Sequence, residues 1–374
     1  MIRYKIGFEK TKAAGVLIEE RGEHMPTTYT HYRFGKDVLD ALPRRIRTAM
    51  ETNRELFDIG LHGPDILFYY RALIPNSVSG QGYGMHKQMA DLFFERAKKV
   101  IADADDKTMS RAYIYGFICH FALDSECHPY VEKMIQKSGI GHSEIEMEFD
   151  RYLLTEDKFD PLTYRQTEHI HATEKNAKVV APFFDHVTAQ QARKALKGMQ
   201  LCHKALYAPG KTKRNLLFGA MKTAGQYDKF HGLVMSEEPN PKCREYCLLL
   251  NKLYEGAIPV AVDLIMKYQN YLLGTGDLPK RFHCTFGACE KEGMDVWHSD
   301  RTAVVCALPV YSTSSDCITA GVSKSVLEDG EGRVDRNRTW SSTVHMCDRR
   351  LHRLSGKRAG WKWTAGYCKG ILSQ

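Results

Sequence analysis

Helical periodicity over a long central stretch is the feature that most restricts how this chain can fold. Between Met25 and Gly274, apolar residues recur at the three- and four-residue spacing of amphipathic helices, and alternating strand patterns are nearly absent. Gly and Pro residues separate these runs, where a helix bundle needs its turns. The runs are residues 34–42, 85–101, 109–124, 142–154, 189–206, 211–224 and 243–273. The sequence therefore predicts an all-α protein built as a multi-helix bundle.

The two ends of the chain differ from this helical zone. Residues 1–24 show no clear pattern, and we expect an unstructured lead-in that is not native if translation starts at Met25. Residues 281–374 contain all four Trp residues and show little helical period. Two interpretations of this tail stay open. It is either an irregular or small β module, with strands near 304–310 and 317–322, or non-native sequence such as a frame-shifted end. The helical domain is predicted at residues 25–280.

Three potential metal ligands recur at helical spacing inside an apolar run. His120, Asp124 and His128 are four residues apart, so they share one face of the helix predicted there. Imidazole nitrogen and carboxylate oxygen are both good zinc ligands. Burying these groups without partners is costly, and a metal ion would remove that cost. The alternative is two satisfied histidines with a salt-bridged Asp124.

The same spacing returns in the next predicted helix. His142 and Glu146 can bind one ion, with Asp150 as an outer partner that orients a ligand. Taken alone, this segment is typical of an acidic amphipathic helix. Two such helices only 14 residues apart, from His128 to His142, favour a shared metal centre instead.

Further candidates lie outside these two helices. Asp65 follows the turn at Gly63-Pro64 at the start of a helix, where it could act as an N-cap, as a metal ligand or as both. His86 is expected at a loop-to-helix junction, and His31 lies in the segment TYTHY. Single histidines of this kind are usually structural. His86 and His31 are therefore candidate metal ligands only because the other candidates indicate a metal centre. His62 is interpreted as an ordinary loop histidine and is not included.

These elements together resemble the bacterial zinc-dependent phospholipase C family, which has a phospholipase C/D domain. The resemblance is carried by MPTTYTHYRFG, GLHGPDILFYY, GMH, GFICHFALDSECHPY and HSEIEMEFD, and it fades toward residue 280. It implies an all-helical bundle, of a type shared with single-strand nucleases, that holds three zinc ions in a cleft. The implied ligands are Asp65, His86, His120 and Asp124 for the first zinc, His128, His142 and Glu146 for the second, and His31, a bridging Asp124 and the amino terminus for the third.

The chain departs from the family pattern in two places. In the secreted enzymes a Trp exposed by processing lies about a dozen residues before the position that matches His31, whereas Met25 lies only six residues before it. The interval from His120 to His128 is also two residues shorter than in those enzymes. The resemblance therefore implies two to three zinc ions, the third without its usual amino-terminal partner.

The resemblance implies a phospholipase C that hydrolyses a phospholipid to diacylglycerol and a phosphorylated head group. Asp65 would serve as ligand and general base, and Asp124 would bridge two ions that activate water and neutralise phosphate charge. Two alternatives stay open: a zinc phosphodiesterase of the single-strand nuclease type, and a helical zinc-binding module without turnover.

Charge and hydropathy bear on the partners and on the compartment. The formal net charge of +8 suits an anionic substrate, and no long Lys/Arg run indicates a nucleic-acid patch. We therefore expect a phospholipid or another phosphodiester as substrate, peripheral contact with a membrane surface and no nucleic acid, and the sequence implies no protein partner. No apolar run is long enough to span a bilayer and no signal peptide is recognisable, so the expected location is the cytoplasm.

Overall fold

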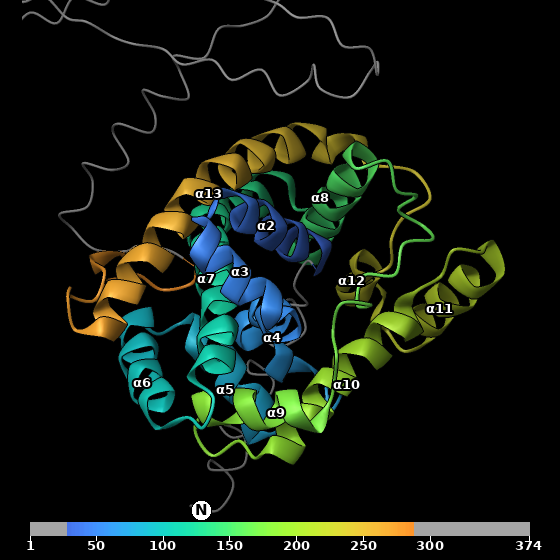
Figure 1. Ribbon diagram of the computed structural model, residues 1–374. Coiled ribbons are helices and arrows are strands. Elements are labelled where there is room, and N and C mark those ends of the chain that lie inside the picture. The colour runs from blue at the N-terminus through green and yellow to red at the C-terminus, as the bar shows by residue number, and fades with distance from the viewer. Residues whose placement is uncertain (1–27, 288–374) are drawn as a thin grey trace, which may run out of the picture. The chain divides into compact units, whose positions relative to one another are not determined.

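The structure is a computed structural model that describes residues 28–287 (Figure 1). Within this range every regular element is helical and no strand occurs, which confirms the predicted all-α fold. The predicted lead-in, and the predicted tail from residue 288 onward with its strands near 304–310 and 317–322, lie outside the described residues. The elements are α2 Thr28–Ala41, α3 Arg44–Thr52, α4 Arg54–Gly60, η1 Gly63–Tyr69, α5 Ser77–His86, α6 Ala90–Asp103, α7 Lys107–Ser138, α8 His142–Glu156, α9 Glu174–Val180, η2 Ala181–Phe183, α10 Ala189–Leu206, α11 Lys211–Thr223, α12 Tyr227–Phe230, η3 His231–Leu233, η4 Pro241–Cys243, α13 Arg244–Leu273 and η5 Lys280–His283.

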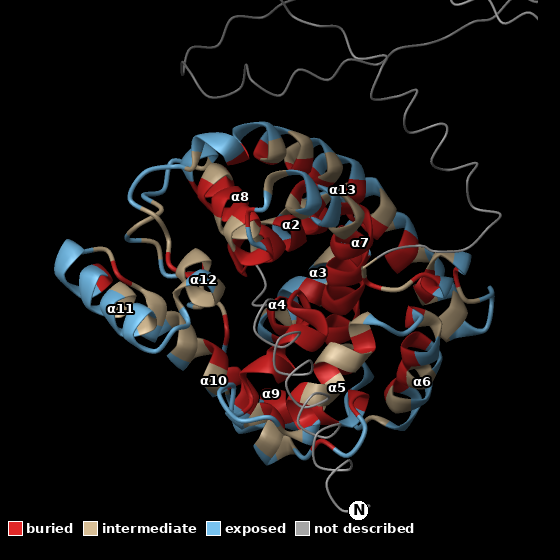
Figure 2. Cartoon of the chain, turned by 180° about the vertical axis from the view of Figure 1, so that it is seen from behind, coloured by how far each residue is buried: buried red, intermediate tan, exposed pale blue. Residues whose placement is uncertain are grey.

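Helix α7 is the centre of the bundle. The carboxylate of Asp106 caps its N-terminus by accepting hydrogen bonds from the backbone N–H groups of Thr108 and Met109, at 2.9 and 3.1 Å. Gly139, in the left-handed conformation with φ 69°, ends it. Helix α7 packs against α2, α4, α8 and α13, and Figure 2 shows it as a largely buried column among them. The histidine stripe of α7 is therefore part of the core.

Two glycines let α4 and α7 cross closely. A Cβ atom at Gly60 would lie 2.1 Å from the Tyr113 carbonyl oxygen, and one at Gly116 would lie 2.1 Å from the Phe57 carbonyl oxygen. Only residues without a side chain permit this approach of two backbones. Because η1 follows α4 directly, this crossing also fixes where η1 and its Asp65 lie against α7.

Some helix boundaries agree with the periodicity and others do not. Helix α10 begins and ends where predicted, with a capping box at Thr188. The helix predicted over 85–101 is instead two helices, because the backbone N–H of Ala90 bonds to the Cys284 carbonyl oxygen (3.0 Å) and α6 starts there. Pro129, one of the prolines expected to separate the predicted runs 109–124 and 142–154, lies inside α7. The packing of α7 against four other helices outweighs the hydrogen bond that this proline removes.

The chain beyond α13 returns to the core. Phe282, Cys284 and Phe286 are all buried, and the Phe286 ring centroid lies 5.9 Å from that of His120. The end of the helical domain at residue 280 stays a prediction, but the core itself includes this following segment. No helix among residues 28–287 is long and apolar enough to cross a bilayer.

Candidate metal centre

The eight candidate ligands converge on one region of the bundle. They come from α2, η1, α5, α7 and α8, so segments far apart in the sequence build the site. Their ligand atoms form three groups, two of which share His120, and within each group all atoms lie within 4.8 Å of one another. The groups are Asp65 with His86 and His120, His31 with His120 and Asp124, and His128 with His142 and Glu146.

The first group lies where η1 and α5 meet α7. His86 Nε2 lies 2.9 Å from Asp65 Oδ1, and His120 Nε2 lies 3.7 Å from Asp65 Oδ2. His86 Nδ1 lies 2.9 Å from the Gly82 carbonyl oxygen, which can only accept, so Nδ1 donates and the neutral ring keeps its lone pair on Nε2. Gly63 has φ 47°, and a Cβ there would lie 2.1 Å from the His120 ring, so this turn requires glycine.

The second group is centred on one carboxylate. Asp124 Oδ1 lies 3.3 Å from His31 Nε2, and Asp124 Oδ2 lies 3.1 Å from His120 Nε2. His120 belongs to both this group and the first, so the two groups are neighbours. Asp124 therefore faces imidazoles from two helices, as a bridging carboxylate must.

Asp150 positions the helix that carries His31. Its carboxylate accepts hydrogen bonds from the backbone N–H groups of Thr28, Tyr29 and Thr30, at 3.2, 3.2 and 2.7 Å, and from the Thr30 hydroxyl at 2.6 Å. These groups form the N-terminus of α2, where backbone donors lack helical partners. Asp150 thus influences His31 through the backbone of α2.

The third group joins α7 to α8. Glu146 Oε1 lies 3.0 Å from His142 Nε2 and 3.5 Å from His128 Nε2. The other nitrogen of His142, Nδ1, lies 3.6 Å from Glu132 Oε1. Outer carboxylates of this kind orient metal-binding imidazoles. The sequence analysis missed Glu132. Its position four residues after His128 on the same predicted helix could have indicated it.

The donor atoms of the three groups fit zinc. Asp65 Oδ1, His120 Nε2 and Glu146 Oε2 are buried and have no hydrogen bond within the described part of the chain. Buried polar atoms without partners are costly, so their convergence is unusual unless a cation joins them. Imidazole nitrogens with carboxylate oxygens are a donor set that zinc binds readily.

Carboxylates reverse the effect of burial on the histidines of the centre. Burial lowers the pKa of an imidazole, but Asp65 outweighs it and raises the pKa of His86 to about 9. Glu146 likewise raises the pKa of His142 to about 10. Burial would raise the pKa of Asp124, yet the facing imidazoles hold that pKa well below its usual value. The centre therefore attracts protons or metal cations strongly.

A second set of buried histidines, not predicted from the sequence, lies beside the centre. His62, left out of the candidate ligands, lies in a turn but is buried: it is 1% exposed, and its Nε2 lies 2.8 Å from His169 Nε2. His203 Nε2 lies 3.2 Å from the Tyr69 hydroxyl and 3.1 Å from the Thr28 hydroxyl. Burial lowers the pKa of His169 to about 3 and that of His203 to about 4. We call His62, His169 and His203 the neutral histidine set.

Two local expectations need correction. The N-cap of η1 is His62, and Asp65 lies inside that helix, so the Asp65 carboxylate is turned to histidines instead of capping. His86 is the last residue of α5, at a helix end, because the segment from Ser77 folds into a helix capped by Asn76. Neither change moves a predicted ligand away from the site.

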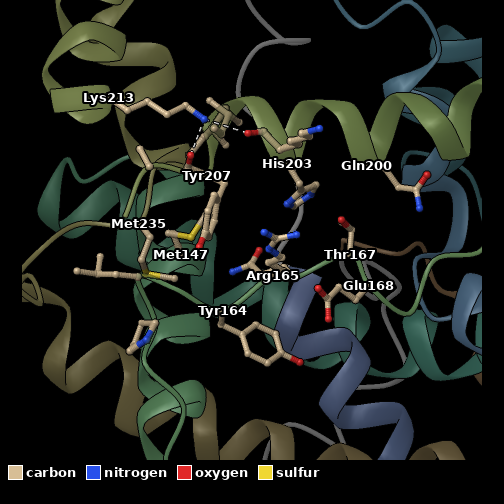
Figure 3. Close-up of a pocket in the computed structure, with 17 residues that line it drawn as sticks. Met147, Tyr164, Arg165, Thr167, Glu168, Gln200, His203, Tyr207, Lys213 and Met235 are labelled. Atoms are coloured by element: carbon tan, nitrogen blue, oxygen red, sulfur yellow. Dashed lines mark hydrogen bonds between the residues drawn. The ribbon is translucent and has the colours of Figure 1, made fainter. Parts of the chain in front are cut away.

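A cavity of about 440 Å³ opens beside the neutral histidine set (Figure 3). His203 lines it from α10, and Met147, which follows Glu146 in α8, lines it from another side. Apolar side chains share its wall with cationic ones, among them Arg165 and Lys204. The cavity therefore offers both kinds of surface beside His203, and none of the eight candidate ligands lines it.

Residues 30–198 match the protein family described as zinc dependent phospholipase C. The matched segment contains all eight candidate ligands and ends within α10. No curated protein and no solved structure gave a match. The match confirms the resemblance found in the sequence, and the all-helical bundle agrees with it. Residues 30–198, which make up just under half of the chain, are therefore similar to the zinc-dependent phospholipase C family.

Proposed function

We propose that this protein is a zinc-dependent phosphodiesterase of the phospholipase C type, which hydrolyses a phospholipid to diacylglycerol and a phosphorylated head group. The observation that carries the proposal is the set of three adjacent ligand groups, two of which share His120. The family match over residues 30–198 supports the same reaction class. The catalytic unit is proposed to begin at residue 25 and to include the segment 280–287, in which Phe282, Cys284 and Phe286 are buried.

The eight predicted residues are the proposed ligands of about two to three zinc ions. Zinc held there would neutralise charge on the phosphate oxygens and lower the pKa of water to about 7. The proposed ligands are Asp65, His86 and His120 for one ion, His128, His142 and Glu146 for another, and His31 with the bridging Asp124 for a third.

Asp65 is the proposed general base. Its Oδ1 atom is buried and accepts no hydrogen bond within the described residues, so it can take a proton from the attacking water. His86 Nε2 lies 2.9 Å from that atom and carries the lone pair of the neutral ring, because the Gly82 carbonyl oxygen accepts the hydrogen bond from Nδ1–H.

The cavity of Figure 3 is the proposed place for the rest of the substrate. Met147, Met235 and Tyr164 provide apolar contact, and Arg165 provides positive charge. A phospholipid needs both, because its phosphate is anionic and its acyl groups are not. The His203 side of this cavity leads to Tyr69, which lies four residues after Asp65.

The test is turnover by the full chain with and without a chelator. Short-chain phosphatidylcholine, a chromogenic phosphodiester and single-stranded DNA are the three substrates, and the lipid products are identified. We expect diacylglycerol from the lipid, loss of turnover in chelator and its return with added zinc. Cleavage of DNA in place of lipid would show a nuclease, and no turnover of any substrate by zinc-loaded protein would contradict the proposal.

A further inference from the structure

The segment 280–287, which follows α13, is bonded to the bundle beside the candidate metal centre. The guanidinium of Arg281 donates to Glu126 Oε1 and to Ser125 Oγ, at 2.6 and 3.2 Å. Both partners follow the candidate ligand Asp124 directly on α7. Figure 1 shows this segment, in orange, beside α6, which η5 contacts. Residues outside the family match therefore have a fixed place next to the proposed ligands.

Phe286 of this segment contacts the rings of two candidate ligands. Its ring centroid lies 5.5 Å from that of His86 in α5 and 5.9 Å from that of His120 in α7. Phe117 and Phe121 of α7 hold the same ring, with centroids 6.0 and 5.3 Å away. The side chain of Phe286 is only 1% exposed. A single buried ring thus packs against ligands from two different helices.

His120 depends on such packing for its orientation. In His86, the nitrogen turned away from Asp65 bonds to the Gly82 carbonyl oxygen at 2.9 Å. The corresponding atom of His120, Nδ1, is buried and has no hydrogen bond to any residue between 28 and 287. Metal-binding imidazoles are usually oriented by such a bond, so ring contacts must fix the side chain of His120 instead. Phe286 supplies one of these contacts.

Phe286 also lines a second cavity, of about 430 Å³, which neither His86 nor His120 lines. The side chains of Gln88 and Leu92 border this cavity and are exposed, so water can enter it. Because Phe286 contacts both the cavity and the two histidines, its ring lies in the wall between them. An apolar shell of this kind controls how water reaches a metal site.

We propose that Phe286 is a positioning residue of the metal centre, whose ring orients the imidazoles of His86 and His120 for zinc and keeps water of the second cavity away from them. The proposal rests on the proposed zinc-dependent function. His120 is shared by two ligand groups, so Phe286 should affect the zinc bound by these two. The third group, centred on Glu146, is formed by other residues and should keep its zinc affinity.

The experiment measures the zinc affinity of the full chain, ion by ion, in competition with a calibrated chelator. Phe286→Leu keeps an apolar side chain but removes the flat ring, and Phe286→Met is a second variant whose flexible side chain adapts to the space. In both we expect the zinc held by His120 to bind about tenfold more weakly. The affinity of the Glu146 group should not change. Phe286→Tyr keeps the ring and should bind zinc like the parent.

Phe282→Leu is the matched control. Phe282 is buried in the same segment and stacks on Phe94 with the centroids 3.9 Å apart, and its other ring partners are Phe121 and Tyr268, none of them a proposed ligand. Urea unfolding in chelator should show a loss of stability in this variant, yet its zinc affinity should equal that of the parent. The absorption spectrum of the Co²⁺-substituted protein reports ligand geometry, and it should change in Phe286→Leu alone.

Parent-like zinc affinity in Phe286→Leu and Phe286→Met overturns the positioning proposal. An equal loss of affinity in Phe282→Leu, or in Phe286→Tyr, overturns it as well. None of these results touches the proposed function, because the parent still binds zinc and turns over its substrate. Zinc binding that depends on Phe286, without turnover of any substrate, defeats the enzymatic function alone. A folded parent that binds no zinc defeats both.

Discussion

The histidines of the candidate metal centre and those of the neutral histidine set are buried in the same bundle, a few ångströms apart, yet their pKa values shift in opposite directions. The ring centroids of His31 and His62 are 6.5 Å apart. The pKa of His31 is raised, because Asp124 outweighs burial, whereas burial and neighbouring imidazoles lower the pKa of His62. The difference lies in the carboxylates, which face only the first set.

This difference separates two uses of a buried imidazole. Where Asp65, Asp124 or Glu146 faces a ring, the site stabilises positive charge, and a metal cation can replace the proton. Where a ring faces another ring or a hydroxyl, as in His169 and His203, the neutral form is favoured and the side chain serves as a polar wall. Substitutions in the two sets should therefore have different consequences.

The largest expected effect is that of Asp124→Asn. The substitution removes the charge that faces His31 and His120, so both imidazoles lose the carboxylate that orients them. We expect loss of bound zinc and a fall in kcat/KM on the order of 1,000-fold, measured by metal analysis and by phosphodiester turnover. His169→Gln, in the neutral set, is the control and should keep its zinc. An active, zinc-loaded Asp124→Asn variant would show that the centre is misplaced.

A smaller effect is expected from Glu132→Gln. Glu132 faces the outer nitrogen of His142 and does not belong to any of the three ligand groups. Zinc affinity should fall about 10- to 100-fold in competition with a calibrated chelator. The exposed Glu156→Gln, at the other end of α8, is the matched control. Equal affinities of the parent and Glu132→Gln would exclude an orienting role.

The smallest expected effect is on the stability contributed by the neutral histidine set, and it appears only at acidic pH. The pKa of His203 is about 4 in the folded chain and about 6.5 when unfolded, so between these values the unfolded chain binds the extra proton. Its contribution to stability is therefore present above pH 6.5 and is lost as the pH falls toward 4. At pH 5 the loss is about 2 kcal/mol. Urea unfolding in chelator at pH 7.5 and 5 should show a shallower pH dependence for His203→Gln, but not for His171→Gln at an exposed site. Identical pH dependence in His203→Gln and the parent would contradict this assignment.

The sequence predicted the candidate ligands that are related by helical spacing, but not the contacts between residues that only the tertiary fold brings together. The i, i+4 pattern placed His120, Asp124 and His128 on one face of α7, because a helix enforces that geometry. The pairing of His62 with His169 has no local signature, since 107 residues separate them. A helix break was expected near Pro129 because the backbone hydrogen bond that a proline removes is a local loss. The packing of α7 that outweighs this loss involves segments far away in the sequence.

The helix boundaries show the same contrast between local sequence and distant contacts. Helix α10 spans the residues predicted from periodicity, and the cap that begins it, Thr188 with Gln191, is formed by residues close in sequence. The break between α5 and α6 was missed because the partner of Ala90 is Cys284, on a segment that follows α13. The resemblance supplied the grouping of the ligands, which spacing alone could not.

The zinc content of the purified full chain tests the central claim most directly. After dialysis without chelator, metal analysis should give about two to three zinc ions per folded chain, with His203→Gln giving the same value. Folded parent protein that binds no zinc, even when zinc is supplied in excess, would contradict the metal centre and the function proposed from it.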